Sequence, residues 1–306
     1  MRKVTLAATQ MACSKDYDEN IKHATKIVEE AKNKGANVIL LQELFERNYF
    51  CQIEDYSRFE YAEVYENSKT LSHFEKVAKE NNVVLPISFF EKAGNCFYNS
   101  LCVIDSDGKR LGLYRKSHIP TGDNYEEKFY FTPGDTGFKV FKSKFGNVGI
   151  GICWDQWFLE TGRILALKGA DFLMFPTAIG SEPILPIDSM PHWRNAMVGQ
   201  SALNIMPVVA SNRIGVESEE KSSMKFYGSS FITDETGCIV ESASRDKEEI
   251  LIHTFDLDSC YQRRRDWGVF RDRRTDLYAP ILKHDDSKEW LLWDWCLLIW
   301  ILFEHI

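Results

Sequence analysis

The segments VTLAATQ (residues 4–10) and NVILL (residues 37–41), with a helical pattern between them, decide the fold. The first is typical of a strand, and apolar residues then recur at helical spacing from Ile21 until Gly35, a residue type that commonly ends helices. The second is a continuous apolar run, as expected of a strand covered on both faces. Together they predict a β-α-β unit that ends at Glu43.

The same alternation continues along the chain. Helices are expected at 71–78, 158–168 and 193–204, and strands at 83–90, 97–104, 110–114, 147–153, 172–175, 207–211, 226–233, 239–241 and 250–255. No linker rich in Pro, Gly or Ser divides the chain. We therefore expect one α/β domain of two similar halves, followed by a C-terminal tail that begins near Asp258.

Composition excludes several classes of protein. The chain has 306 residues, of which 44% are hydrophobic and 27% charged, which is ordinary for a globular protein with a sizeable core. Lys and Arg number 37 against 45 Asp and Glu, so the formal charge is −8. This acidic balance gives little reason to expect a nucleic-acid partner and mildly favours a cationic ligand.

The cysteines argue against metal binding and secretion. The eight cysteines form no C-x-x-C pair and no cluster with histidine at zinc spacing, so no metal site is expected. The start of the chain lacks the apolar core of a signal peptide. Free thiols in a reducing cytoplasm are the natural interpretation.

One segment, WLLWDWCLLIWILF (residues 290–303), is almost wholly apolar. It contains Asp294 and is shorter than the ~18 to 20 apolar residues that span a bilayer, so a membrane anchor is the least favoured interpretation. The segment either packs on a partner subunit or is a sequence end that does not belong to the native gene. A homo-oligomer would cover such a segment, whereas a monomer would leave it exposed.

Three reactive side chains remain after familiar sites are dismissed. There is no G-x-S-x-G elbow and no P-loop, and Gly149-Ile-Gly151 lacks the third glycine of a dinucleotide fingerprint. Glu43, Lys116 and Cys153 each lie at or just beyond the end of an expected strand, where ligands bind in α/β sheets. Taken singly, they could be a loop carboxylate, a surface charge and a core thiol.

Taken together, the three side chains support attack of a thiol on a carbonyl carbon. Glu43 is the candidate base for the thiol proton, and Lys116 favours the thiolate. Lys116 and the backbone N–H of Trp154 would stabilise the oxyanion. A base that returns its proton suits an amine leaving group, so the pattern points to C–N bond hydrolysis through a covalent intermediate on Cys153. No cofactor is called for.

Three segments carry a resemblance to a known family. LQELF (41–45), YRKSHIP (114–120) and GIGICWDQW (149–157) resemble, in this order, the Glu, Lys and Cys motifs of the nitrilase (carbon-nitrogen hydrolase) superfamily. The resemblance implies a four-layer αββα sandwich and a carbon-nitrogen hydrolase domain over residues 1–282. Residues 283–306, an apolar tail, resemble nothing in the family.

The resemblance also implies roles for four residues. Cys153 would be the nucleophile, Glu43 the proton acceptor, Lys116 the cation that stabilises the intermediate, and Glu127 a second, supporting carboxylate. A lysine between two carboxylates stays charged, while one carboxylate is free to exchange a proton. Without the resemblance, Glu127 could equally be a surface acid.

Further segments resemble those members of the superfamily that act on N-carbamoylputrescine. They are YEEKFYF (125–131), PTAIGSEP (176–183), HWR (192–194), ASNRIG (210–215), FYGSSF (226–231) and WGVFRDRR (267–274). This implies a cytoplasmic, homo-oligomeric enzyme of polyamine biosynthesis that hydrolyses the carbamoyl-amine to putrescine, carbon dioxide and ammonia.

The ammonium end of such a substrate calls for a carboxylate and aromatic faces. We expect Glu182 and Tyr49 to supply them, although Tyr49 could be an aromatic plug in its loop and Glu182 an acid at a helix start. Trp154 and His118 complete the expected substrate-binding set, and His118 is expected to orient the Lys116 loop rather than to react.

Two other functions stay open. A different carbamoyl or aliphatic amide hydrolase, such as a β-ureidopropionase or a carbamoyl amino acid hydrolase, would need a pocket arginine or lysine because its substrate carries a carboxylate. An inactive assembly or binding protein on the same scaffold is the alternative from another class. The intact set of Glu43, Lys116 and Cys153 argues against it.

Overall fold

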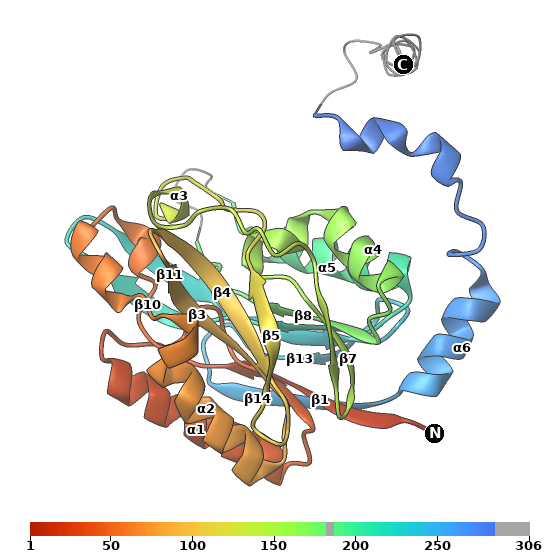
Figure 1. Cartoon of the computed structure of the whole chain (residues 1–306), viewed down its shortest axis with the longest axis horizontal. Coiled ribbons are helices and arrows are strands. Elements are labelled where there is room, and N and C mark those ends of the chain that lie inside the picture. The colour runs from red at the N-terminus through yellow and green to blue at the C-terminus, as the bar shows by residue number, and fades with distance from the viewer. Residues whose placement is uncertain (182–186, 285–306) are drawn as a thin grey trace, which may run out of the picture. The chain divides into compact units, whose positions relative to one another are not determined.

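The computed structural model describes residues 1–181 and 187–284 of the chain. Contacts between residues divide it into two units, Met1–Arg264 and Arg265–Ile306. The first unit contains both sheets and the helices that cover them, shown in Figure 1.

The first sheet has the strand order β14-β1-β2 and is continued by β3-β4-β5 through a parallel bridge between Val38 and Val84. Its strands are β1 (Lys3–Gln10), β2 (Val38–Leu40), β3 (Leu85–Ala93), β4 (Cys96–Ile104), β5 (Arg110–Arg115) and β14 (Glu249–Asp256). β1 and β2 pair in parallel, as the β-α-β pattern predicts, and β14 pairs antiparallel with β1.

The second sheet has the order β13-β12-β9-β8-β7-β6, in which β7, β8 and β9 are parallel. Its strands are β6 (Val140–Ser143), β7 (Gly146–Ile150), β8 (Phe172–Pro176), β9 (Val208–Ser211), β12 (Phe231–Thr233) and β13 (Ile239–Ser242). β10 (Ile214–Ser218) and β11 (Ser223–Tyr227) form a separate antiparallel pair.

Helices cover the outer faces of the two sheets (Figure 1). These covering helices are α1 (Tyr17–Asn33), α2 (Lys69–Asn81), α4 (Leu159–Leu167) and α5 (Met190–Asn204). The chain also forms α6 (Leu257–Trp267) after β14, the short helix α3 (Glu127–Tyr130) and the 3-10 turns η1 (Phe50–Gln52), η2 (Tyr56–Tyr61), η3 (Tyr65–Asn67), η4 (Cys153–Trp157), η5 (Thr275–Leu277) and η6 (Ala279–Leu282). Side-chain caps define two helix starts: Asp16 accepts from the backbone of Glu19, and Ser68 from that of Leu71.

Both faces of the first sheet are buried because its side chains alternate between the two faces. Leu6 and Leu40 of the first sheet meet Ile150 and Met174 of the second in one buried cluster. On the other face of the first sheet, residues such as Ile39 pack under α1 and α2. Each fully buried aliphatic side chain contributes roughly 1.5–3 kcal/mol. The layers run helix, sheet, sheet, helix, which confirms the expected αββα sandwich.

Several boundaries differ from those predicted. The strand expected at 147–153 ends at Ile150, and Cys153 begins η4 instead. The run expected at 226–233 is two strands, because Gly228 and Ser229 turn the chain with φ of 50° and 59°. Where a tail was expected from Asp258, the chain forms α6.

The second unit is described as far as His284, and it holds η5, η6 and local ion pairs such as Arg274 with Asp276. The expected domain boundary after residue 282 stays a prediction. The apolar segment 290–303 lies outside the described residues. None of the helices within residues 1–181 and 187–284 combines the length and apolar character that crossing a membrane requires.

Candidate active site

Cys153 lies on a tight turn just past the end of β7. Its φ is 42°, a left-handed conformation that costs a non-glycine residue roughly 1–3 kcal/mol. The buried carboxylate of Asp155 compensates, since it accepts the backbone N–H of Ile152 at 2.9 Å. Gly151 precedes the turn because a Cβ there would lie 2.6 Å from the ring of Phe175. The thiol is therefore carried by this turn and not by β7 itself.

Lys116 lies between two carboxylates, all three fully buried. It directly follows β5, and its Nζ donates to Oε1 of Glu43 at 2.8 Å and to Oε1 and Oε2 of Glu127 at 2.9 and 2.7 Å. Asn99 on β4 donates to the same Glu43 oxygen at 2.7 Å. Glu43 lies three residues past β2, and Glu127 begins α3. The fold thus gathers side chains from four separate elements.

The two carboxylates are bonded differently. Both oxygens of Glu127 are engaged, because Oε1 also accepts the hydroxyl of Tyr49 at 2.7 Å. Oε2 of Glu43 is buried and has no hydrogen-bond partner among the described residues. Glu43, and not Glu127, therefore has a carboxylate oxygen that can take up a proton without breaking a hydrogen bond.

Burial and charge set the protonation states. Burial lowers the pKa of Lys116, but the charges of Glu127 and Glu43 raise it well above its usual value. Burial raises the pKa of Glu127 to about 7, with Lys116 acting in the opposite direction. Burial and the charge of Glu43 raise the pKa of the Cys153 thiol well above its usual value, against the effect of Lys116. Lys116 thus favours the thiolate, as expected, while burial and Glu43 favour the protonated thiol more strongly.

Cys153 also lines a cavity of about 350 Å³. The residues around it include Asp123, Tyr125, Trp154, Trp157 and His192. Asp123 is the one carboxylate, and there is no lysine or arginine, among the described residues of this lining. The cavity is therefore largely apolar and aromatic, with a thiol at one point and a carboxylate at another.

The other expected site residues have varied positions. His118 is held by Asp155, and its ring stacks on Phe158 with centroids 3.6 Å apart, so it is fixed in the loop after Lys116. Trp154 occupies an early position in η4, where a backbone N–H has no acceptor within the helix. Tyr49 is buried behind Glu127 rather than among the described residues of the cavity lining. Glu182 lies outside the described residues.

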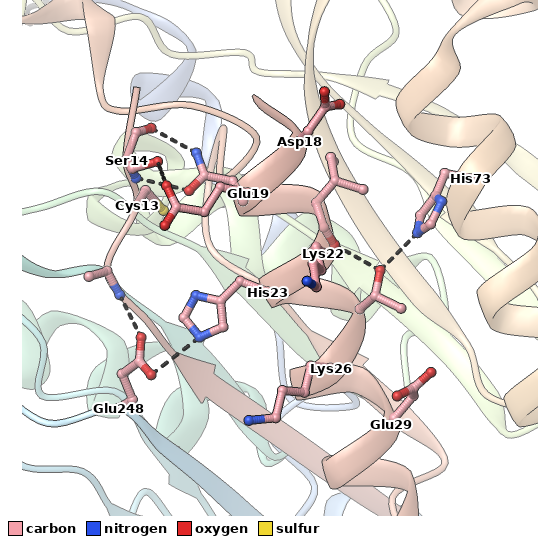
Figure 2. A pocket seen from close by; sticks show the side chains of 14 residues that line it. Cys13, Ser14, Asp18, Glu19, Lys22, His23, Lys26, Glu29, His73 and Glu248 are labelled. Atoms are coloured by element: carbon pink, nitrogen blue, oxygen red, sulfur yellow. Dashed lines mark hydrogen bonds and ion pairs between the residues drawn. The ribbon is translucent and has the colours of Figure 1, made fainter. Parts of the chain in front are cut away.

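A larger depression, of about 840 Å³, lies on the face of α1 (Figure 2). Its polar side chains pair with one another: His23 with Glu248 at 3.2 Å, and Thr25 with His73 at 2.8 Å. It has no buried cluster like that around Lys116. Across residues 1–181 and 187–284, no group of three or more His, Cys, Asp or Glu side chains is placed to hold a metal ion.

Sequence reasoning missed Asp155, Asn99 and Asp123. Asp155 stands two residues after Cys153, inside the recognised motif, so its proximity was a usable signal. Asn99 reaches Glu43 from 56 positions along the chain, a pairing that only the strand register determines. Asp123 is one of many loop acids until the fold brings it to the cavity.

The chain is similar to known proteins over most of its length. The profile of the carbon-nitrogen hydrolase family matches residues 5–265. An Arabidopsis thaliana N-carbamoylputrescine amidase is 52% identical over 291 residues, which cover 94% of this chain and 97% of that protein. A Francisella tularensis citrullinase is 47% identical over 285 residues, 92% of this chain and 99% of that protein.

A solved structure is similar as well. The carbon-nitrogen hydrolase from Helicobacter pylori G27 superposes with a TM-score of 0.86 at 38% identity, covering 92% of this chain and 99% of that one. The resemblance to the carbon-nitrogen hydrolase family is therefore confirmed over nearly the whole chain. The chain belongs to the carbon-nitrogen hydrolase family, also known as the nitrilase superfamily.

Proposed function

We propose that this chain hydrolyses N-carbamoylputrescine to putrescine, carbon dioxide and ammonia through a covalent intermediate on Cys153. The observation that carries the proposal is the buried Lys116 between Glu43 and Glu127, electrostatically coupled to a thiol that lines a cavity. The plant amidase at 52% identity supports the choice of substrate.

In the first half-reaction, Sγ of Cys153 attacks the carbamoyl carbon while its proton passes to Oε2 of Glu43. The carbonyl electron pair moves onto oxygen, where the charge of Lys116 and the N–H of Trp154 stabilise it. Glu43 then returns the proton to the terminal carbamoyl nitrogen, this C–N bond breaks and ammonia leaves. The carbamoyl carbon, which still carries the putrescine nitrogen, remains bound to sulfur.

In the second half-reaction, water replaces the nitrogen that left. Glu43 accepts a proton from the water as its oxygen bonds to the carbonyl carbon, and the C–S bond breaks as the sulfur regains a proton. The carbamate released decomposes to carbon dioxide and an amine. Glu127, fully engaged by Lys116 and Tyr49, holds the lysine in place throughout.

The cavity favours a carbamoyl-amine over a carbamoyl amino acid. Asp123 can pair with the terminal ammonium, and the faces of Trp154 and Trp157 can hold a cation. Citrulline is the same molecule with an added carboxylate, which would enter a lining without lysine or arginine among the described residues. Glu182 stays a second predicted partner for the ammonium.

The test is ammonia release from four ureas: N-carbamoylputrescine, uncharged butylurea, citrulline and N-carbamoyl-β-alanine. We expect N-carbamoylputrescine to have the highest kcat/KM, and Asp123→Asn to lower it at least tenfold while leaving butylurea unchanged. The exposed Asp107→Asn serves as the matched control. Preference for citrulline or N-carbamoyl-β-alanine would remove the polyamine assignment.

The inactive-scaffold alternative is tested by mass spectrometry. Wild-type protein quenched during turnover should carry a carbamoyl adduct that is absent from Cys153→Ala. A wild type that forms no adduct and turns over no amide or carbamoyl compound would favour a binding protein.

We also propose that the chain is cytoplasmic and assembles with copies of itself. All seven cysteines in the described ranges are free thiols, which suits a reducing compartment. Leu159 and Leu167 on α4 and Leu203 on α5 are exposed, and an interface would bury them. Light scattering of the purified protein measures the subunit number, and a monomer would contradict the second part.

A further inference from the structure

A buried ion pair, separate from Lys116 and its two carboxylates, bonds the loop that carries Glu43. Arg213 follows β9 and is fully buried, and Glu217 lies four residues later on β10. Nη1 of Arg213 donates to Oε1 of Glu217 at 2.9 Å. Neither side chain takes part in the reaction steps proposed above, although Arg213 belongs to the segment ASNRIG singled out in the sequence.

The arginine satisfies backbone carbonyls of that loop. Its Nη2 donates to the carbonyl oxygen of Glu43 at 2.8 Å and to that of Leu44 at 2.5 Å, and its Nη1 to that of Arg47 at 2.9 Å. Buried carbonyls outside a sheet need such donors. Leu44 also has a φ of 48°, so the side chain stabilises a strained backbone directly beside Glu43.

The glutamate fixes the other end of the loop. Oε2 of Glu217 accepts the backbone N–H of Tyr49 at 2.5 Å, and the Tyr49 hydroxyl in turn donates to Glu127. The guanidinium of Arg213 lies 5.9 Å from the centroid of the Tyr49 ring. The pair therefore forms hydrogen bonds with both ends of the loop 43–49. Within this loop, Glu43 bonds Lys116 and Tyr49 bonds Glu127.

We propose that Arg213 and Glu217 are positioning residues that set the distance between the Glu43 carboxylate and the Cys153 thiol. Neither of them is among the described residues that line the cavity. Proton transfer requires hydrogen-bond distance, and a displacement of about 1 Å can cost about 100-fold in rate. The inference rests on the proposed role of Glu43 and is independent of which carbamoyl compound is the substrate.

Two variants test the pair. Glu217→Gln keeps the shape but loses the charge that holds Arg213, and Arg213→Lys keeps a charge but cannot reach three carbonyl groups and Glu217 together. We expect each to lower kcat about 10- to 100-fold with KM within about threefold, measured well below the melting temperature. Should Arg213→Lys fail to fold, Glu217→Gln alone decides.

A control pair separates positioning from general stability. Arg110 on β5 bonds Glu75 of α2 and the carbonyl of Tyr65, so it too joins a carboxylate to a backbone oxygen. Glu75→Gln should lower the melting temperature without changing kcat. The proposal would be overturned if Glu75→Gln and Glu217→Gln lost equal stability and the kcat of Glu217→Gln stayed within threefold of wild type.

A double-mutant cycle examines the route through Tyr49. If Glu217 acts partly through the Tyr49–Glu127 hydrogen bond, Glu217→Gln should cost less kcat in a Tyr49→Phe background than in wild type. If Glu217 has only a structural role, the effects of the two substitutions on kcat should be additive. Additive effects would contradict action of Glu217 through Tyr49.

Alkylation gives a readout that does not depend on turnover. Iodoacetamide is a neutral amide, and the thiol of Cys153 must lose its proton to an acceptor when it reacts with this reagent. Glu217→Gln should therefore slow the labelling of Cys153 at least fivefold. If wild-type protein turns over none of the carbamoyl compounds, the proposed function fails, and this rate still decides the positioning role. Equal labelling rates in wild type and variant would contradict it.

Discussion

Asp155 accepts two hydrogen bonds from His118, one from the backbone nitrogen at 3.0 Å and one from Nδ1 at 2.7 Å. The same carboxylate accepts the N–H of Ile152, the residue before Cys153, at 2.9 Å, and the hydroxyl of Tyr114 at 2.7 Å. A single buried side chain therefore connects the loop after Lys116 to the turn that carries the thiol.

Asp155→Asn should damage both stability and rate. The amide presents donors to groups that are themselves donors, so we expect a loss of about 2 kcal/mol in the free energy of unfolding. Because the turn and the loop then separate, kcat should fall at least tenfold. Urea unfolding and steady-state kinetics measure the two effects.

The matched control is Asp234→Asn, since Asp234 also accepts backbone N–H groups, from Thr236 and Cys238 in a hairpin turn. This variant should lose some stability and keep kcat. An Asp155→Asn protein with kcat within twofold of wild type would contradict the positioning role of Asp155.

Tyr49→Phe should move the acidic limb of the pH–rate profile. The Tyr49 hydroxyl stabilises the charged form of Glu127 and so lowers its pKa, against the burial that raises it. Loss of a hydrogen bond to a charged group corresponds to about one pH unit, so kcat/KM should begin to fall at higher pH than in wild type. An unchanged limb would show that Glu127 does not control it.

Lys116→Met should destabilise the protein in a pH-dependent way. Removing one partner of a buried ion pair costs about 3–5 kcal/mol because the other charge is left unpaired. The ammonium of Lys116 lowers the pKa of Glu127, so its removal lets that pKa rise above about 7. The folded variant then binds more protons than the unfolded chain, so the stability gap to wild type widens as pH rises above neutrality.

Unfolding free energies of Lys116→Met at several pH values check this sign. The exposed Lys109, which pairs with Asp107 at 2.6 Å, provides the comparison. Lys109→Met should show a small gap that does not change with pH, and a constant gap for Lys116→Met would contradict the linkage.

Glu46→Gln should stabilise the protein at alkaline pH. Burial raises the pKa of Glu46 from 4.5 to about 7, and its Oε2 has no partner among the described residues. When the pKa of a carboxyl group is higher in the folded protein than in the unfolded chain, the protein loses stability as pH rises from the unfolded pKa through the folded one. At 1.36 kcal/mol per unit of pKa, the charged form costs the folded state about 3 kcal/mol above neutrality.

The difference in stability between Glu46→Gln and wild type should therefore grow from acid to alkaline pH and then level off. Thermal unfolding across that range measures it, with the exposed Glu80→Gln as a control that should show no trend. A variant that is less stable than wild type at alkaline pH would show that the carboxylate has a partner of structural value.

Local sequence patterns predicted most of the fold. The helical spacing around Ala24 and the apolar run at 37–41 each match an element of the structure, because their burial depends on faces that the pattern itself defines. The prediction of a single strand at 226–233 was wrong. A positive φ at Ser229 separates strands of two different sheets, and an apolar pattern gives no sign of such a turn.

The candidate site was predictable in part. Glu43, Lys116 and Glu127 were named from motifs, and the structure bonds them to one another. Tyr49 is predicted to bind the substrate, and in the structure its hydroxyl donates to Glu127. Arg213, 170 positions from Glu43, bonds the backbone carbonyl of Glu43 in the same loop. Such contacts are a property of the tertiary fold, and only a structure assigns them.

The burial of the Cys153 thiol has a consequence for its oxidation. Peroxide and disulfides react with the thiolate, so a nucleophile that ionises only as it attacks is shielded from oxidation between turnovers. The burial that raises the pKa of Cys153 thus doubles as a redox safeguard, and sulfenic acid should form more slowly there than on an ordinary exposed cysteine.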